Sequence, residues 1–431
     1  MKKANLKPGA RWQFFKNGGA FRALGYRDFF LFWSSYFVSN VGSWMQSVAQ
    51  GWLLFDLTSS PLYLGLFSAV RMVLLVVFFV LGGLMADRLD RRKVMLFIQS
   101  TSALTALAMA VLVSLKVIHV WHIFVLGAIT STAWAFEQPV RQAMIPQLVS
   151  RDDLVNALAL NALVWNGAGL LGPGLVGLSV GWIGIEGCFY VNVVSYLAVI
   201  VALFCVRIPP LDPNIAHASV LRSLREGLRY VRTESVIVTF LMVSAVYNIF
   251  GRSYITLLPV FAKEVLGLGA SGLGFLAAAP GLGTVIGSLG LATLGRVEAK
   301  PGRMLILLTA VSAALFAFAA SHHFDLTFTC LVLVGTLSTI FETLLQTSIQ
   351  LQVAEAFRGR VMGFYGLTTG GLREFGGMQA GFLAEWTSAP FAIEAGVVIV
   401  VIVGFWFFGA RSRRLFREPS RPAPNSRTGY S

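Results

Sequence analysis

Four ionisable side chains lie inside long apolar stretches of this sequence, and they are its best candidates for chemistry. They are Arg71, Arg252, Arg373 and Glu374. A charge in hydrocarbon is costly unless it has a partner or water, so such residues are typical of ion and substrate pathways. Glu374 is the one acid that we place near the middle of an apolar stretch. We therefore expect it to carry a proton, with Arg71 or Arg252 as the positive partner of its ionised form.

Arg373 and Glu374 are adjacent, which limits how a helix can present them. Neighbouring residues on an α-helix point about 100° apart, so the two side chains should not face the same partner. We expect at least one of them to face a central cavity. The alternative is that both charges are permanently paired and structural.

The elements that position these charges are twelve apolar segments, each about as long as a membrane-spanning helix. The composition agrees, since the 431 residues are 56% hydrophobic and only 13% charged, about half the charge of a soluble protein. The sequence therefore predicts an all-α membrane protein without a large soluble domain. The segments are expected at roughly 29–54, 62–85, 94–115, 121–145, 156–179, 187–207, 235–260, 270–293, 303–321, 325–350, 361–386 and 391–410.

Internal similarity divides the chain into two pseudo-symmetric six-helix halves. Phe136-Glu137 recurs as Phe341-Glu342. Repeats of this kind place a substrate site between the halves and let access to it alternate. We predict a cytoplasmic arm at 1–28, helix bundles at 29–207 and 235–410, a linker at 208–234 and a disordered tail at 411–431. The linker should contain a basic amphipathic helix, which is either a tether or a regulatory element that lies on the membrane surface.

Positive charge is distributed unevenly between the two ends of these segments. Of the 34 Lys and Arg residues, 29 fall in the termini and in the loops on the same side, if Arg141 is counted in the loop after the fourth segment. Only Lys116 and Lys263 fall on the other side. The positive-inside rule therefore predicts cytoplasmic termini. Because the charge is spread over seven membrane-edge segments, we expect contact with anionic lipids rather than with nucleic acid.

Residues for catalysis, ATP hydrolysis or metal binding do not form any pattern that we can identify. The chain has no Gly-Lys dipeptide for a phosphate-binding loop, and its three cysteines have no paired spacing. We therefore expect no enzyme activity, no cofactor and no metal site. Transport would be driven by a gradient, and a monomer is the favoured state.

A charged loop joins the second and third segments. Residues 83–93 read Gly-Leu-Met-Ala-Asp-Arg-Leu-Asp-Arg-Arg-Lys. This loop resembles the signature G-x-L-A-D-R-x-G-R-R of the major facilitator superfamily, with Met85 and Asp90 as departures from it. The resemblance implies a twelve-helix transporter with a cytoplasmic gate made by Gly83, Asp87, Arg88, Arg91 and Arg92.

The same resemblance suggests partners for the gate. Glu137, near the cytoplasmic end of the fourth segment, is expected to pair with Arg91 or Arg92. Its counterpart Glu342 is expected in an equivalent place in the second half. Asp87 is expected beside the start of the eleventh segment, near Gly359 and Arg360, when the cytoplasmic side is closed. A carboxylate is stabilised there by the unpaired amides of a helix N-terminus.

Small residues are dense in the fifth segment. Gly172, Pro173 and Gly177 match a loose form of the antiporter motif of exporting facilitators, which ends G-P-x-x-G-G, and Val176 departs from it. Small residues also let membrane helices pack closely, and proline bends a span. The motif favours export over import, and ordinary close packing is the alternative.

Polar and aromatic side chains could line a substrate cavity. Tyr36, Asn40 and Gln46 fall near one face of the first segment, and Trp44 and Trp165 could contact a bulky ligand. Polar groups in hydrocarbon favour an interior or wet face. Most membrane aromatics, in contrast, face lipid or lie at the interfaces.

Two further loops resemble one bacterial branch of the same superfamily. Residues 146–157 and 357–363 are similar to the 4–5 and 10–11 loops of the branch that contains enterobactin exporters and macrolide-efflux proteins. The resemblance implies a proton-coupled antiporter of the bacterial inner membrane. Its substrate would be a bulky, amphipathic small molecule such as a siderophore or a drug. A lipid or lysolipid flippase on the same fold and a non-transporting membrane sensor are the alternatives.

Overall fold

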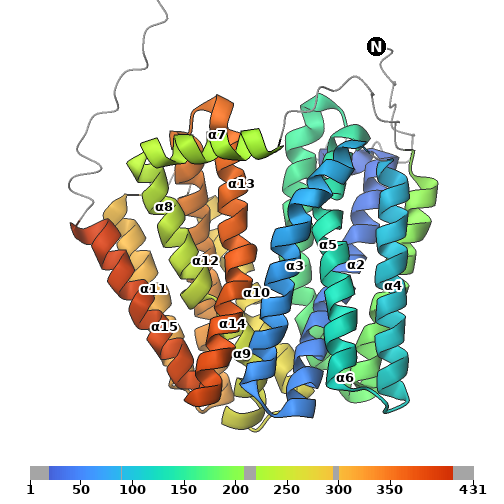
Figure 1. Ribbon diagram of the computed structural model, residues 1–431, viewed down its shortest axis with the longest axis vertical. Coiled ribbons are helices and arrows are strands. Elements are labelled where there is room, and N and C mark those ends of the chain that lie inside the picture. The colour runs from blue at the N-terminus through green and yellow to red at the C-terminus, as the bar shows by residue number, and fades with distance from the viewer. Residues whose placement is uncertain (1–18, 89, 208–219, 295–299, 411–431) are drawn as a thin grey trace, which may run out of the picture.

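The computed structural model is a bundle of long helices that run side by side (Figure 1). The chain passes along this bundle twelve times. The structure describes residues 19–88, 90–207, 220–294 and 300–410, without the side chains of 20, 79–88, 220–224, 294, 356 and 410. Within the described ranges all regular structure is helical. The predicted all-α fold with twelve spans is confirmed, and the predicted segment limits lie within a few residues of the helix limits.

The first six passes form an N-terminal group, and the last six form a C-terminal group. The N-terminal group consists of α2 (Arg27–Thr58), α3 (Pro61–Arg88), α4 (Arg91–Ser114), α5 (Val120–Leu148) and the long α6 (Leu154–Cys205), which passes twice. The C-terminal group begins with the interrupted pass Ser235–Val265, which contains α8 (Ser235–Val246), η4 (Tyr247–Gly251), α9 (Tyr254–Val260) and η5 (Phe261–Val265). It continues with α10 (Ala270–Leu294), α11 (Pro301–Ala319), α12 (Phe324–Gln352), α13 (Arg358–Thr369) with α14 (Gly371–Trp386), and α15 (Ala389–Gly404) with η7 (Phe405–Ala410).

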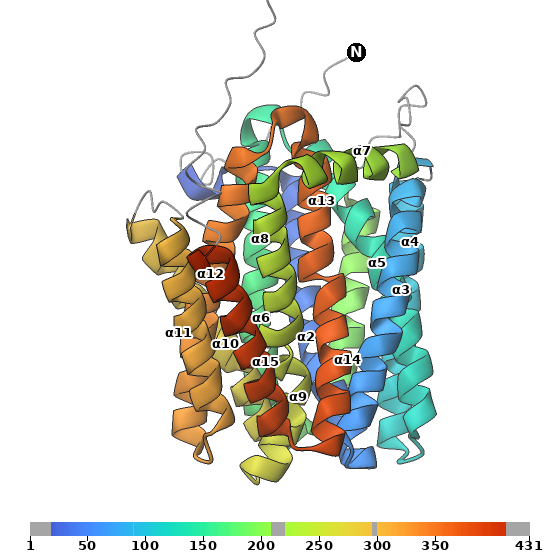
Figure 2. The same cartoon turned by 60° about the vertical axis from the view of Figure 1, so that its left-hand side comes forward.

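A separate helix, α7 (Val220–Thr233), lies across one end of the bundle (Figure 2). The first long helix, α2, begins at the same end (Figure 1). We call this the α7 end and the opposite one the far end. The N-terminal group is on the right of Figure 1 and the C-terminal group is on the left.

α6 reverses direction at a single glycine. Gly184 has a φ of 67°, in the left-handed region that favours glycine, and helix continues on both sides of it. The sequence predicted two segments here, at 156–179 and 187–207, joined by a short loop. The turn is tighter than that loop because glycine can adopt a backbone conformation that other residues rarely adopt.

Three of the twelve passes are less apolar than the others. Eight helical stretches of the described chain are long and apolar enough to cross a membrane, and one of them, Arg151–Cys205, holds two passes. The passes left over are α2, α5 and the α13–α14 pair. Their lower apolarity follows from the polar residues that they hold within the bundle, which include Gln46, Gln50, Glu137, Arg141, Arg373 and Glu374.

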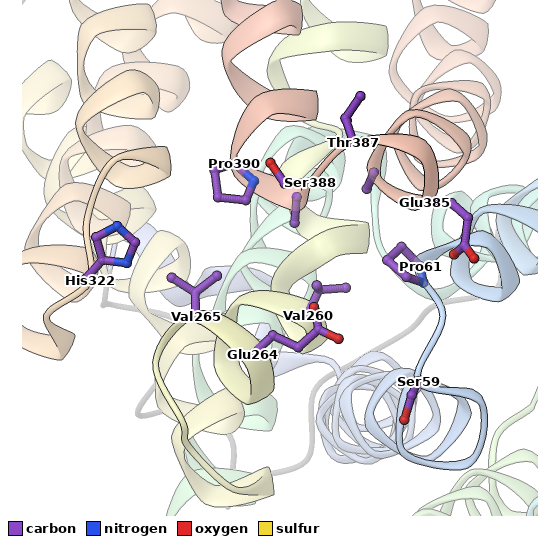
Figure 3. Close-up of a pocket in the computed structure, with 12 residues that line it drawn as sticks. Ser59, Pro61, Val260, Glu264, Val265, His322, Glu385, Thr387, Ser388 and Pro390 are labelled. Atoms are coloured by element: carbon purple, nitrogen blue, oxygen red, sulfur yellow. The ribbon is translucent and has the colours of Figure 1, made fainter.

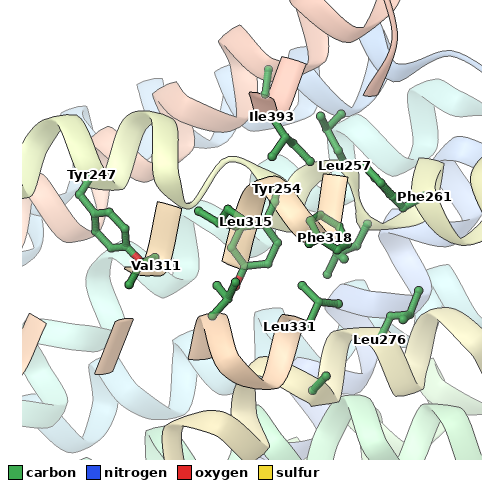
Figure 4. Packing of buried hydrophobic residues seen from close by; sticks show 14 of the residues in the cluster. Tyr247, Tyr254, Leu257, Phe261, Leu276, Val311, Leu315, Phe318, Leu331 and Ile393 are labelled. Atoms are coloured by element: carbon green, nitrogen blue, oxygen red, sulfur yellow. The ribbon is translucent and has the colours of Figure 1, made fainter. Parts of the chain in front are cut away.

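The C-terminal group has a continuous apolar core (Figure 4). The rings of Tyr254 and Phe261 both contact Phe318 of α11, with centroids 5.9 and 4.5 Å from it. Leu315 and Leu331 are almost fully buried in the same cluster. This packing anchors α9, the segment that follows the interruption of the seventh pass.

Glycines bring the two groups into contact. α6 packs on α10, where Gly177 lies against Gly274 and the Ser271 hydroxyl donates a hydrogen bond to the Gly177 carbonyl. α3 packs on α14, where Gly65 lies against Gly381. A side chain at Gly65, Gly274 or Gly381 would meet the opposite backbone, and one at Gly177 would meet the Phe275 ring, so the small residues allow the close approach.

The contact between α6 and α10 can be tested by overpacking. Gly281 of α10 faces the backbone of Gly169 and Leu170, so Gly281→Leu should destabilise the protein by about 1–3 kcal/mol. Gly290, on the same helix, has open space around it, and Gly290→Leu is the matched control. Thermal unfolding of the purified protein should give a lower midpoint for Gly281→Leu. Equal midpoints for the two variants would contradict the packing described here.

Candidate functional site

A buried carboxylate joins the two groups near the middle of the bundle. Glu374 of α14 is 6% exposed, and its Oε1 lies 3.3 Å from Nη2 of Arg71 on α3. Nη2 of Arg373 lies 3.5 Å from the same oxygen. The predicted pair of Arg71 and Glu374 is therefore present. The long side chain of Arg373 turns back towards Glu374, so the two adjacent residues contact each other.

A break in the eleventh pass positions this cluster. α13 ends at Thr369 and α14 begins at Gly371, with Gly370 between them at φ −96° and ψ −67°. Glu374 lies in the first turn of α14. The amides of that turn lack partners within the helix, and together with the helix dipole they favour a carboxylate. Helices interrupted at mid-membrane depth are typical of transport sites.

A second ion pair lies within the C-terminal group. Nη1 of Arg252 is 2.9 Å from each carboxylate oxygen of Glu342 on α12. Of the two partners expected for Glu374, Arg252 is therefore not the one present. The expectation that Glu342 lies near a helix end is wrong. Glu342 is ten residues before Gln352, the end of α12, and that is about 15 Å of helix.

Irregular turns of the seventh pass place Arg252. η4 is a π-helical segment, and the Arg252 amide donates to the Tyr247 carbonyl at 3.2 Å. A new helix, α9, starts two residues later. π-helical turns occur mostly as single insertions and are frequent at functional sites. The sequence signalled the charge of Arg252 but not the change of helix type that orients it.

Arg141 is a buried charge that the sequence analysis assigned to a loop. It lies inside α5 and is 4% exposed. Its guanidinium donates to Oε1 of Gln138 at 2.7 Å and to Oδ1 of Asn161 at 3.3 Å, and it lies 5.4 Å from the centre of the Tyr36 ring. The helical spacing of Trp134, Gln138 and Arg141 is the signal that could have placed it on an interior face.

The predicted pairing of Glu137 with Arg91 or Arg92 is wrong. Arg91 donates to the Ala143 carbonyl and Arg92 donates to the Phe204 carbonyl, each at 3.0 Å. Both arginines begin α4 at the α7 end, whereas Glu137 lies 11 residues before the end of α5, about 16 Å deeper. Within the described chain Glu137 forms no ion pair.

The other gate residues lie outside the described side chains. α3 continues as helix through Gly83, Asp87 and Arg88, but the structure describes only their backbone. Asp90, which departs from the signature, has a clear role because its Oδ1 accepts hydrogen bonds from the amides of Arg92 and Lys93 at 3.0 and 3.3 Å. It is the N-cap of α4, a position in which aspartate stabilises a helix more than glycine does.

Two of the predicted cavity residues belong to the core of the N-terminal group. Tyr36 is 2% exposed, and its hydroxyl accepts a hydrogen bond from Gln99 of α4 at 3.2 Å. Gln46 is buried, and its Oε1 accepts one from Asn192 of α6 at 2.7 Å. These bonds join α2 to its neighbours, so neither residue lines a cavity here. Asn40 is half-buried, and its amide donates to the Tyr36 carbonyl.

Trp44 and Trp165, in contrast, are both half-buried and meet edge to face. Their ring centroids are 5.8 Å apart at an angle of 61°. The antiporter-like residues of α6 lie close by. Gly172 packs under Trp44, whereas Pro173 and Gly177 face Gly274 of α10. The geometry supports the close-packing alternative for these three residues, and a role in antiport stays a prediction.

The charges described near mid-depth do not balance. They are Arg71, Arg141, Arg252, Arg373, Glu137, Glu342 and Glu374, which leaves one more arginine than glutamates. Among the described residues no group of three or more His, Cys, Asp or Glu side chains is suited to a metal ion.

Polar contacts join the two groups at the far end. Glu385, in the last turn of α14, accepts hydrogen bonds from the Ser60 hydroxyl at 2.6 Å and from the Leu62 amide at 3.1 Å. It thereby caps the start of α3, a helix of the other group. Nζ of Lys263 lies 2.6 Å from Oδ1 of Asp56. We call these two contacts the far-end latch.

A hollow of about 490 Å³ opens beside the far-end latch (Figure 3). Pro61 and Glu385 line one side of it, and Glu264 and His322 line another. Pro61 is ten residues from Arg71 along α3, about 15 Å of helix. The hollow is therefore separate from the buried charges at mid-depth.

The linker helix α7 is docked on the C-terminal group. Glu226 pairs with Arg360 of α13 at 3.1 Å, and the Tyr230 ring stacks on Phe357 with centroids 4.3 Å apart. The Tyr230 hydroxyl accepts a hydrogen bond from the Ala354 amide. The half of α7 whose side chains are described thus contacts protein at the start of the eleventh pass, where the sequence analysis expected Asp87.

Comparison with known families identifies one that spans almost the whole chain. Residues 19–423 match the family described as transmembrane secretion effector. The staphyloferrin A transporter of Staphylococcus aureus is 24% identical over 77% of this chain and 83% of its own. The enterobactin exporter EntS of Shigella flexneri is 27% identical over 76% of this chain and 78% of its own.

Solved structures of transporters share the fold at low sequence identity. A bacterial homologue of the human lysosomal transporter Spinster, in an inward-facing and unoccupied conformation, superposes with a TM-score of 0.73. It is 15% identical and the match covers 92% of this chain and 98% of that one. The nucleoside transporter NupG gives a TM-score of 0.70 at 14% identity, over 91% of this chain and all of its own.

The far-end latch should control how often the far end opens. Glu385→Ala removes the cap of α3 and one link between the groups, so the population with a separated far end should increase. Spin labels at Leu57 and Leu326, two exposed positions near this end, should report longer distances in a variant whose three cysteines are replaced. Glu234→Ala, at the α7 end, is the matched control. Unchanged distances in Glu385→Ala would show that the cap does not hold the groups together.

Proposed function

The chain belongs to the transmembrane secretion effector family of the major facilitator transporters, and we propose that it is a proton-coupled exporter of a bulky, amphipathic small molecule. Membership makes it a multi-pass membrane transporter and not an enzyme. The observation that carries the proposal is the Arg71–Glu374 ion pair, because it links the two groups at mid-depth. Any movement of one group against the other must change this pair.

Alternating access supplies the mechanism. The described contacts between the groups include a latch at the far end, so the site in this structure is closed on that side. In the opposite state, closure of the α7 end would bring Asp87 towards the start of α13, and the far-end latch would part. The Arg71–Glu374 pair would then separate or re-form, and protonation of Glu374 would favour its separation. A change of conformation can be driven only by such a difference in interaction between states.

The direction of transport is proposed from the relatives. The similarity to enterobactin exporters supports export and supports a siderophore-like or drug-like cargo. The loose antiporter motif at Gly172, Pro173 and Gly177 favours the same direction. We propose a cell-membrane location in a bacterium, with 29–207 and 235–410 as the two moving halves, protons as the coupling ion and anionic lipids around the basic edges.

The orientation is proposed from the positive charges. With both termini cytoplasmic, the α7 end faces the cytoplasm and this structure is the inward-facing state. Lys116 and Lys263 then lie on the outside.

This orientation predicts the behaviour of topology reporters. A reporter fused after Arg207 or at the C-terminus should be active in the cytoplasm, because these sites lie on the positively charged side. Fusions near Lys116 and Lys263 should be active outside. The measurement compares an alkaline phosphatase fusion with a green fluorescent protein fusion at each site. An external C-terminus would overturn the orientation.

The coupling role of Glu374 is tested by Glu374→Gln. A deletion strain grown on a panel of antibiotics and siderophores, with and without a proton uncoupler, first identifies a substrate. Uptake of that substrate into everted vesicles should then lose its response to a pH gradient in Glu374→Gln, while downhill exchange is spared. The neutral amide keeps the size of the side chain but cannot release a proton.

Two controls make this experiment specific. Glu394→Gln changes another half-buried acid of the C-terminal group and should leave coupling intact. Glu342→Gln should lower the yield of folded protein, because it leaves the half-buried Arg252 without its carboxylate partner. If Glu374→Gln still concentrates the substrate in response to a pH gradient, the proton is carried elsewhere and Glu137 is the next acid to test.

A further inference from the structure

We propose that Trp44, Trp134 and Trp165 form a binding platform for a flat aromatic ring that carries oxygen substituents. This inference rests on the proposed function and names the part of the transported molecule that the N-terminal group recognises. The three residues come from three different helices, α2, α5 and α6, which meet at this point.

The three rings meet without covering one another. Trp165 lies 5.8 Å from Trp44 at 61° and 6.2 Å from Trp134 at 44°, measured between ring centroids and planes. All three side chains are only half-buried. Inclined and partly open rings present both faces and edges, and a further aromatic ring can pack against such a set in stacked or edge-to-face geometry.

The indole N–H groups of these three residues have no acceptor among the described residues. Trp33 on the same helix as Trp44 differs, because its indole donates to the Leu160 carbonyl at 2.8 Å. A buried or interfacial indole usually finds an acceptor. Three free donors beside aromatic faces therefore suit a ligand with oxygen acceptors on its ring.

The platform lies near mid-depth, beside the contact between the two groups. Trp134 is 14 residues from either end of α5, and therefore near mid-depth. Gly169 and Gly172 of α6 pack against Trp44, and the backbone next to Gly169 also contacts Gly281 of α10. The glycine-dense part of α6 thus contacts the tryptophan platform and also contacts α10 of the C-terminal group.

The nearby charges argue against a cationic ligand. Tryptophan faces also attract cations, and Glu137 follows Trp134 by three residues, which puts it on a neighbouring part of the same helix face. Arg141, however, lies on that face as well, seven residues after Trp134, and the described charges at mid-depth contain a surplus of arginine. A neutral or anionic aromatic ligand therefore fits better than a protonated amine.

The test measures binding to the purified transporter in nanodiscs, without a pH gradient. The probe is 7-hydroxycoumarin, a planar ring with oxygen substituents, and energy transfer from tryptophan reports its binding. Trp134→Leu and Trp165→Leu should each weaken binding about tenfold, the effect of losing one aromatic contact of about 1.4 kcal/mol. Trp134→Phe should restore part of the affinity, because phenylalanine keeps the ring and loses only the N–H donor.

Controls distinguish the loss of a ligand contact at the platform from the loss of any tryptophan and from unfolding. Trp121→Leu removes a tryptophan that is 60% exposed at the start of α5, and it should leave the affinity unchanged. Thermal unfolding of each variant checks that a loss of binding is not a loss of fold. Ethidium, a flat aromatic cation, should bind more weakly than 7-hydroxycoumarin to the unaltered protein.

Two results would overturn the proposal. One is equal binding of 7-hydroxycoumarin to the unaltered protein and to both leucine variants, and the other is tighter binding of ethidium through the same tryptophans. Because the assay needs no proton gradient, it can fail while Glu374 still couples transport. It can also succeed if the protein is not coupled to protons, so the two proposals fail separately.

Discussion

The cost of placing charge inside an apolar bundle is the constraint on which the rest of this structure depends. Arg71, Arg252, Arg373, Glu342 and Glu374 all lie within passes of the bundle, Arg252 at the interruption of the seventh. Each of them is paired, and the Arg71–Glu374 pair is made between the two groups of helices. Stability of the bundle and its capacity to move are therefore tied to the same contact. A pair within one group, such as Arg252 with Glu342, can persist through a rigid-body motion.

The helices that carry these charges are irregular where the charges are. The seventh pass changes to π-helix just before Arg252, and the eleventh pass breaks at Gly370 just before Glu374. An unbroken α-helix satisfies its own backbone groups and presents side chains at fixed angles. An interruption frees amides and re-aims side chains, which has a cost in a membrane unless the freed groups find partners. Glu374 in the first turn of α14 is one such partner.

The two ends of the bundle are built differently. At the far end, a carboxylate of one group caps a helix of the other, and glycine pairs bring the backbones together. At the α7 end, Glu226 and Tyr230 hold the linker helix on the C-terminal group. The far end thus links the two groups directly, whereas the linker contacts described here are made with the C-terminal group. This asymmetry fits a molecule captured in one of two alternating states.

The sequence by itself determined the fold class, the twelve spans and the identity of the charged residues, because the length and apolarity of a segment are local properties. It also gave Arg71 and Arg252 as alternative partners for Glu374, and the structure contains the Arg71 pair. The tertiary structure decided the other partners. Arg252 meets Glu342, Arg141 belongs to the interior, and Tyr36 and Gln46 belong to the core. Which side chains meet depends on which helices are neighbours and at what depth each residue lies. Helical periodicity records the face of a residue, but not the helix that packs against it.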